Sequence, residues 1–271
     1  MKKIFCLVFV AMMILSLGLP AFAGSGSIYC WSCGSLIPSD SSFCPYCGSS
    51  QSHGSSNSSS SSSSSSPYSS ASYNVGDIVT FGSYEQDNIS YNGKEPIEWI
   101  VLDVNKSSRQ LFLITRYGIE SAKYNNKEAS VTWDNCTLRS WLNNTFFYDA
   151  FSSAEQQSIL TTNVGASKNP NYPGKDPGKD TSDKLFILSA PEADYYLTKS
   201  NMRKTPATDA AVSHGVQNYT EDNGCCWWWM RNPGFYHNRA VHAYISGEWN
   251  YDGIAVNCST LAVRPVMWIK Y

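Results

Sequence analysis

The chain has 271 residues, of which 20 are Lys or Arg and 22 are Asp or Glu, and its formal net charge is -2. Because binding to nucleic acid requires clustered Lys and Arg, this balanced charge argues against nucleic acid as a partner. Aromatic residues make up 14% of the chain, with nine Trp and 17 Tyr, which fits either an aromatic core or a face that recognises ligands by stacking.

The first 23 residues have the pattern of an export signal. Lys2 and Lys3 precede the apolar run Ile4–Leu19, and the small-residue motif Ala21-Phe22-Ala23 ends the segment. The apolar run is shorter than the roughly 20 residues that a membrane span needs. We therefore expect cleavage, a secreted or cell-surface protein and no membrane span in the mature chain; an uncleaved anchor is the alternative.

Four cysteines follow the signal in the pattern Cys30-x2-Cys33 and Cys44-x2-Cys47. The two-residue gap lets both sulfurs of a pair bind one ion, and two pairs complete a closed tetrahedral site for structural Zn²⁺. The module over residues 28–48 has few apolar residues, so metal binding would supply much of its folding free energy. With its Phe-Cys-Pro-Tyr-Cys-Gly motif it resembles the zinc-ribbon family, which implies a structural or docking role. In an oxidising compartment the same thiols could instead pair as disulfides.

Residues 49–72 are almost all Ser, with an unbroken run from Ser58 to Ser66. Such a segment cannot bury enough apolar surface to offset its chain entropy. We expect a disordered tether that spans about 25–30 Å, followed by a globular domain over residues 73–271.

The globular domain is predicted to contain both strands and helices. Apolar and β-branched runs predict strands over residues 77–84, 96–103, 110–115, 184–189, 227–230, 239–245, 253–257 and 262–269. Helices are predicted at residues 137–143 and after two capping boxes, Ser152–Glu155 and Ser189–Glu192. Pro265 predicts a sheet edge or a bulge in the last strand. Helices in the middle with strands at both ends predict an α+β domain.

Several of these segments resemble a bacterial family of uncharacterised domains, domain-of-unknown-function family 6273. The matching stretches lie at residues 76–84, 96–102, 132–143, 183–189, 228–234 and 263–266. The terminal Val-Arg-Pro strand and the tryptophan-rich strand before it also look like those of the C-type-lectin-like fold, which occurs in formylglycine-generating enzymes and in retroelement-diversified binding proteins.

The C-type-lectin-like resemblance implies that the first and last strands come together and that the loops at 232–238 and 247–252 are exposed as a ligand face. The candidate residues for that face are Trp228, Arg231, Asn232, Tyr236, His237, Trp249, Asn250 and Asp252.

The catalytic and metal-binding residues of these relatives do not carry over. Formylglycine-generating enzymes use two cysteines a few residues apart, whereas Cys225 and Cys226 are adjacent and Cys258 is distant. Lectin-type calcium sites need carboxylate and amide ligands that Glu95-Pro96-Ile97 and Trp249-Asn250 do not supply, so we expect no calcium site of that type.

Four cysteines of the globular domain could form one or two disulfides in an oxidising compartment. Adjacent cysteines bond to each other only with strain, so we expect Cys225 or Cys226 to pair with Cys136 or Cys258.

Among the other polar and aromatic residues, His237 and His242 would point to opposite faces of a strand and share no metal. Two of the three tryptophans at 227–229 are expected in the core. Arg231 and Arg264 are expected to form structural ion pairs.

The sequence therefore predicts a non-catalytic extracellular or cell-surface protein with a structural zinc ribbon, whose ligand is an envelope carbohydrate or protein. One alternative is an extracellular cysteine- or metal-dependent enzyme that uses the cysteines or histidines of the C-terminal third. Another is a purely structural envelope protein that docks through its ribbon. A concave patch with two or more exposed aromatic rings would favour binding.

Overall fold

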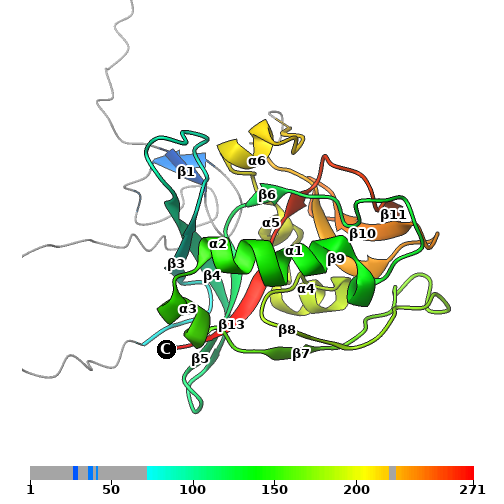
Figure 1. Ribbon diagram of the computed structural model, residues 1–271, viewed down its shortest axis with the longest axis horizontal. Coiled ribbons are helices and arrows are strands. Elements are labelled where there is room, and N and C mark those ends of the chain that lie inside the picture. The colour runs from blue at the N-terminus through cyan, green and yellow to red at the C-terminus, as the bar shows by residue number, and fades with distance from the viewer. Residues whose placement is uncertain (1–26, 30–35, 39–40, 42–71, 220–223) are drawn as a thin grey trace, which may run out of the picture.

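The computed structural model describes residues 27–29, 36–38, 41, 72–219 and 224–271 (Figure 1). The predicted export signal, the four cysteines of the ribbon and nearly all of the serine segment lie outside the described residues. Strands β1 (Ser27–Tyr29) and β2 (Leu36–Pro38) pair antiparallel. They stand directly before and after the segment 30–35, which carries the first cysteine pair of the ribbon.

A four-stranded antiparallel sheet, in the order β13-β5-β4-β3, forms one half of the domain (Figure 1). Its strands are β3 (Ile78–Tyr84), β4 (Glu95–Asn105), β5 (Gln110–Thr115) and β13 (Val266–Lys270). The predictions for the first three strands and for the hairpin between β4 and β5 are confirmed. Consecutive residues Trp99–Leu102 of β4 are buried, so both faces of this central strand are covered.

The first and last strands of the domain, β3 and β13, occupy opposite edges of this sheet with β4 and β5 between them. They share a sheet but are not neighbours, which differs from the arrangement that the C-type-lectin-like resemblance implies.

A five-stranded sheet, in the order β11-β10-β9-β12-β6, forms the other half. Its strands are β6 (Glu120–Ser121), β9 (Trp228–Pro233), β10 (Arg239–Ala243), β11 (Trp249–Ala255) and β12 (Ala262–Val263). The chain passes from this sheet to the first one at Arg264 and Pro265, between β12 and β13. Proline has no N–H for a sheet ladder, so the strand predicted over 262–269 is interrupted at this residue.

Short helices and one small sheet connect the two halves. They are η1 (Trp133–Asn135), α1 (Thr137–Trp141), the π-helical turn η2 (Leu142–Phe146), α2 (Phe147–Ala150), α3 (Ser153–Ser158), α4 (Ala190–Tyr196), α5 (Ser200–Arg203), α6 (Asp209–Ser213) and the paired strands β7 (Thr162–Val164) and β8 (Thr181–Asp183). Both predicted capping boxes are present, at the starts of α3 and α4. The helix predicted over 137–143 continues through η2 into α2. Within the described ranges, the search for a helix with the length and hydropathy of a membrane span found none.

Two of the three consecutive tryptophans fill the core, as predicted. Trp228 and Trp229 are fully buried, whereas Trp227 is half-buried. The indole N–H of Trp228 donates to the Arg203 carbonyl at 2.9 Å, and that of Trp229 donates to the Ala122 carbonyl at 2.8 Å. Each ring is therefore buried with its one polar atom satisfied.

The strand predicted over residues 184–189 is wrong. The segment is buried, but its only ladder contact is an isolated bridge between Phe186 and Val266. The side-chain amide of Asn143 bonds to the backbone of Lys184 and Leu185 instead. Burial explains the apolar run, and a side chain satisfies the backbone in place of a neighbouring strand.

The strands at the C-terminal end also differ in their bounds from the predicted ones. The strand expected over 239–245 ends at Ala243, and that expected over 253–257 begins earlier, at Trp249. Part of the loop expected at 247–252 is therefore the first half of β11.

The predicted disulfides of the globular domain are not formed: Cys136, Cys225, Cys226 and Cys258 carry separate thiols in the part of the chain that the structure describes. The Cys226 thiol donates to the Thr205 carbonyl at 3.3 Å, and the Cys136 thiol donates to the Trp133 carbonyl at 3.5 Å. Burial raises the pKa of the Cys136 thiol to about 12 and that of Cys226 still further. Protonated thiols are poor nucleophiles.

The two arginines expected to form ion pairs behave differently. Arg231 pairs with Glu192, as predicted. Arg264 is fully buried without a carboxylate partner among the described residues; it donates from Nε to the Thr115 carbonyl at 2.9 Å and lies over the Trp228 ring. Burial lowers its pKa to about 10. The ion pair predicted for Arg264 is therefore wrong, and a carbonyl and an aromatic face take its place.

We predict that His242 makes the stability of the domain dependent on pH. Its ring is buried between Trp227 and Tyr244, and neither nitrogen has a hydrogen-bond partner in the described structure. Burial lowers the pKa of His242 from 6.5 to about 4. The unfolded chain therefore binds a proton at a higher pH than the folded one, and the free energy of unfolding should fall by about 3 kcal/mol as the pH drops through this interval.

Denaturant unfolding of the full chain at a series of pH values measures this effect. The variant His242→Leu should lose most of the dependence between pH 6.5 and 4, whereas the exposed control His237→Leu should keep it. An unchanged slope in His242→Leu would show that other groups cause the dependence.

Candidate ligand-binding site

Three of the eight residues predicted for the ligand face lie in the core. Trp228, Arg231 and Asn232 belong to β9 and are at most 3% exposed. Since β9 is the central strand of the five-stranded sheet, both of its faces are covered. The placement of these residues on an exposed face is therefore wrong.

Two further candidates, Trp249 and Asn250, are half-buried in β11 and held by contacts within the domain. The indole N–H of Trp249 donates to Asp194 at 2.9 Å, and the guanidinium of Arg203 lies over the ring at 4.4 Å. The Asn250 amide donates to the Tyr244 hydroxyl at 2.5 Å. The polar atoms of both side chains are thus already occupied.

The remaining candidates, Tyr236, His237 and Asp252, are exposed. The first two lie in the connection between β9 and β10, and Asp252 lies on β11. The structure adds residues that the sequence analysis missed. Tyr172, Phe235 and Arg239 line one hollow together with Tyr236 and Asp252, with a volume of about 270 Å³. We call these five residues the aromatic face.

The three rings of the aromatic face pack edge to face. The ring centres of Tyr172 and Phe235 are 4.9 Å apart, and those of Phe235 and Tyr236 are 4.7 Å apart. Phe235 is 37% exposed and Tyr236 is 55% exposed. The rings hold one another in place and still present surface to a ligand.

Charged groups border these rings. The guanidinium of Arg239 lies over the Tyr236 ring, 5.6 Å from its centre, and the ammonium of Lys175 lies over the Phe235 ring at 4.7 Å. The Tyr172 hydroxyl donates to the Asp252 carboxylate, which raises the pKa of Tyr172. The hollow thus offers apolar ring surface, a cation and a carboxylate side by side.

The loop that carries Tyr172 is anchored by a buried side chain. Asn169 is fully buried, and its amide donates to the carbonyls of Pro233 and Tyr251 at 2.8 and 2.7 Å. These carbonyls belong to β9 and β11. One side chain therefore ties the loop to the strand that precedes Phe235 and to the strand that carries Asp252.

Gly234 allows the turn after β9 to pack closely against the backbone of β11. A Cβ atom on Gly234 would lie 2.6 Å from the Asp252 carbonyl, and the neighbouring Phe235 N–H donates to that carbonyl at 3.0 Å. Any side chain at position 234 would push the turn away from β11.

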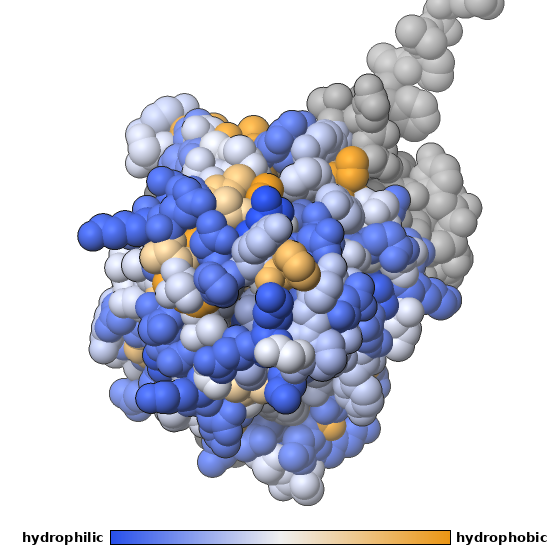
Figure 2. Space-filling view, turned by 90° about the vertical axis from the view of Figure 1, so that its right-hand side faces the viewer, coloured by the Kyte–Doolittle hydropathy of each residue, from blue (hydrophilic) through white to orange (hydrophobic). Residues whose placement is uncertain are grey.

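Beside the aromatic face lies a smaller cavity of about 130 Å³, lined in part by Lys175, Gly234 and His237. Figure 2 views the side of the domain on which β10 and β11 lie, and it shows hydrophobic residues in small, separate groups among hydrophilic ones. A ligand that covers this side must therefore match a largely polar surface.

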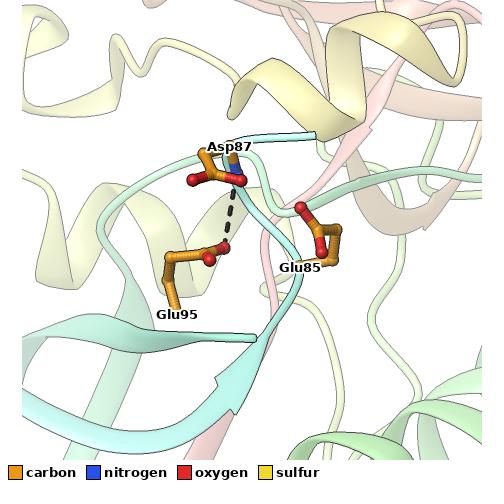
Figure 3. Close-up of side chains that lie close together, drawn as sticks. All are labelled: Glu85, Asp87 and Glu95. Carbon is orange, nitrogen blue, oxygen red and sulfur yellow. Dashed lines mark hydrogen bonds between the residues drawn. The ribbon is translucent and has the colours of Figure 1, made fainter. Parts of the chain in front are cut away.

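Glu85, Asp87 and Glu95 bring three carboxylates together at the end of β3 and the start of β4 (Figure 3). Their oxygens lie within 4.8 Å of one another, which suits a hard cation such as Ca²⁺. Backbone N–H groups already bond to them: those of Gln86 and Asp87 donate to Glu95, and that of Ile89 donates to the other two carboxylates. These bonds hold the connection between the two strands.

Two family models match the chain. One, described as a domain of unknown function (DUF6273), matches residues 108–271, and one described as a zinc-ribbon domain matches residues 29–51. Neither the curated proteins nor the solved structures gave a match. The resemblances to the zinc-ribbon family and to DUF6273 are thereby confirmed, and the DUF6273 match begins after the stretches at 76–84 and 96–102. Neither description states an activity, so the function must be argued from the site.

We predict that Asn169→Ala disrupts the aromatic face and destabilises the domain. The substitution removes the two hydrogen bonds that the Asn169 amide donates, so the free energy of unfolding should fall by about 2 kcal/mol. The exposed residue Asn171 provides a matched control, and Asn171→Ala should unfold like the parent chain. Denaturant titration of both variants measures the difference, and equal stability would mean that water replaces the Asn169 amide at no cost.

Proposed function

The chain belongs to the DUF6273 family, and we propose that this member is an exported, non-catalytic binding protein that holds a carbohydrate on its aromatic face. The observation that carries the proposal is the hollow in which the rings of Tyr172, Phe235 and Tyr236 lie beside Arg239 and Asp252. A sugar presents both apolar C–H groups and hydroxyls, and this hollow offers a partner for each.

The two kinds of contact are chemically distinct. The electron-rich face of an aromatic ring attracts the weakly positive C–H groups of a pyranose. A guanidinium donates hydrogen bonds to hydroxyl oxygens, and a carboxylate accepts them from hydroxyl groups. The shallow shape suits an end or a side of a glycan chain better than a fully enclosed small molecule.

Further support comes from nucleophilic and titratable side chains that are buried in the core. Cys136 and Cys226 are buried with raised thiol pKa values, and His242 is buried as well. The side chains at the aromatic face are better suited to non-covalent binding than to covalent catalysis. The tryptophan-rich and Val-Arg-Pro strands also resemble those of the C-type-lectin-like fold. This is an analogy of individual strands only, because β3 and β13 are not neighbours as that fold implies.

The zinc ribbon is the structural module of the proposed exported protein. The chain carries a zinc-ribbon domain, and its four thiolates from Cys30, Cys33, Cys44 and Cys47 are the donor set of a closed structural zinc site. We assign these cysteines to one Zn²⁺, the export signal to the first 23 residues and a tether to residues 49–72. Together they would present the binding domain outside the cell.

We predict that removing a ring of the aromatic face weakens carbohydrate binding. The full chain, tested against arrayed neutral and acidic glycans, should bind at least one, and Phe235→Ala and Tyr236→Ala should each weaken that binding about fivefold to tenfold. Tyr91, which is 91% exposed in the connection between β3 and β4, serves as a control, and Tyr91→Ala should bind normally. Failure to bind any glycan, or full binding by Tyr236→Ala, would overturn the proposal.

We predict that the native chain binds one Zn²⁺ through the ribbon cysteines. Elemental analysis of the secreted protein should find one zinc per chain, and Cys33→Ser should lower the affinity for zinc because one thiolate is lost. Cys258→Ser, outside the ribbon, is the control and should keep the metal. Two disulfides among the four ribbon cysteines, found by mass spectrometry under non-reducing conditions, would contradict this prediction.

A further inference from the structure

A further cavity with a polar wall lies away from the aromatic face. It has a volume of about 370 Å³ and is formed by the start of β6, by α1 and by the residue after α6. In Figure 1, β6 and α6 lie at the top of the domain, and β10 and β11 lie at its right-hand side. The cavity is large enough for a small cyclic molecule.

A histidine held by a carboxylate forms one wall. Nδ1 of His214 lies 2.8 Å from Oε1 of Glu120. Because a carboxylate only accepts hydrogen bonds, Nδ1 must carry the hydrogen. The second ring nitrogen, Nε2, is then an acceptor in the neutral ring and a donor in the imidazolium form. The side chain of His214 is 51% exposed, so Nε2 can reach a ligand.

The carboxylate of Glu120 is itself fixed and largely satisfied. The Tyr84 hydroxyl donates to Oε2 at 2.9 Å, and the Ser121 N–H donates to Oε1 at 2.8 Å. With His214 these make three donors on a side chain that is only 12% exposed. Glu120 thus orients the imidazole and has little capacity left for a ligand of its own.

The other walls supply a cation and a ring. Lys123 is exposed at the cavity and forms no ion pair within the described ranges. The half-buried indole of Trp141 and the buried Leu138 give the cavity an apolar wall. The cavity is therefore lined by an ammonium, by an imidazole that donates from Nε2 when it is protonated, and by a flat apolar surface.

We propose that this cavity is a second binding site, which takes a small molecule with a carboxylate on a six-membered ring. The ammonium of Lys123 and Nε2–H of the imidazolium form of His214 hold the carboxylate, and the ring lies against Trp141 and Leu138. The ring can be that of a sugar acid or of an aromatic acid, since both have this shared chemistry. The site does not depend on the carbohydrate proposed for the aromatic face.

Calorimetric titration of the full chain with four compounds tests the proposal. Glucuronate and benzoate each have a ring and a carboxylate, glucose has the ring alone, and acetate has the carboxylate alone. At least one of the two ring carboxylates should bind about tenfold more tightly than glucose and acetate. Comparison of glucuronate with benzoate then distinguishes a sugar acid from an aromatic acid.

Variants assign the binding to this cavity. His214→Ala and Lys123→Ala should each weaken binding of the ring carboxylate about tenfold or more. Lys127→Ala, an exposed lysine that does not line the cavity, should bind normally. Tyr236→Ala should also bind normally, which separates this site from the aromatic face.

Two results would overturn the proposal. The first is that neither ring carboxylate binds better than glucose and acetate. The second is that binding persists in both His214→Ala and Lys123→Ala while their unfolding transitions match that of the parent chain.

Discussion

Buried asparagine side chains hold the irregular middle of this domain in place. The segment between β7 and β9 includes backbone that is buried but has few strand neighbours, and each buried polar group must still find a partner. Asn232 donates to the carbonyls of Ser167 and Lys168 and accepts from the Ala190 N–H. The buried Asn169 and the half-buried Asn143 act in the same way. Each amide has two donors and an acceptor, so it can satisfy loop backbone groups that have no neighbouring strand.

This constraint also explains where the aromatic face lies. Asn169 joins its loop to the end of β9 and to Tyr251 within β11, and this brings Tyr172 against Phe235 although the two residues are far apart in the chain. Asn232, predicted as a ligand residue, instead supports the same loop from the core. The exposed rings therefore rest on a rigid base, so little side-chain freedom remains to be lost on binding.

The sequence predicted local features well and long-range ones poorly. The strands β3, β4 and β5 and both capping boxes follow from patterns within a few residues. The segment 184–189 was mistaken for a strand because burial alone produces an apolar run. The three ligand-face residues on β9 were wrongly predicted to be exposed. β9 lies at the centre of its sheet because it pairs with β12, which is distant in the sequence. The adjacent aromatics Phe235 and Tyr236 after a glycine were a local signal for the site, whereas nothing local marks Tyr172.

The distribution of reactive and exposed groups supports binding at the surface. The thiols of Cys136 and Cys226 are kept protonated by burial, and Arg264 is enclosed with a carbonyl and an indole. What remains at the surface is the face of Phe235 and Tyr236 with its charged border, and a separate cavity in which Glu120 is saturated by donors. A nucleophile needs an activated atom close to a substrate, whereas rings and fixed hydrogen-bonding groups need only a complementary shape. These features support the proposed binding function, and the two proposed sites differ in charge. The aromatic face has a carboxylate beside a cation, and the other site has an oriented imidazole with a lysine.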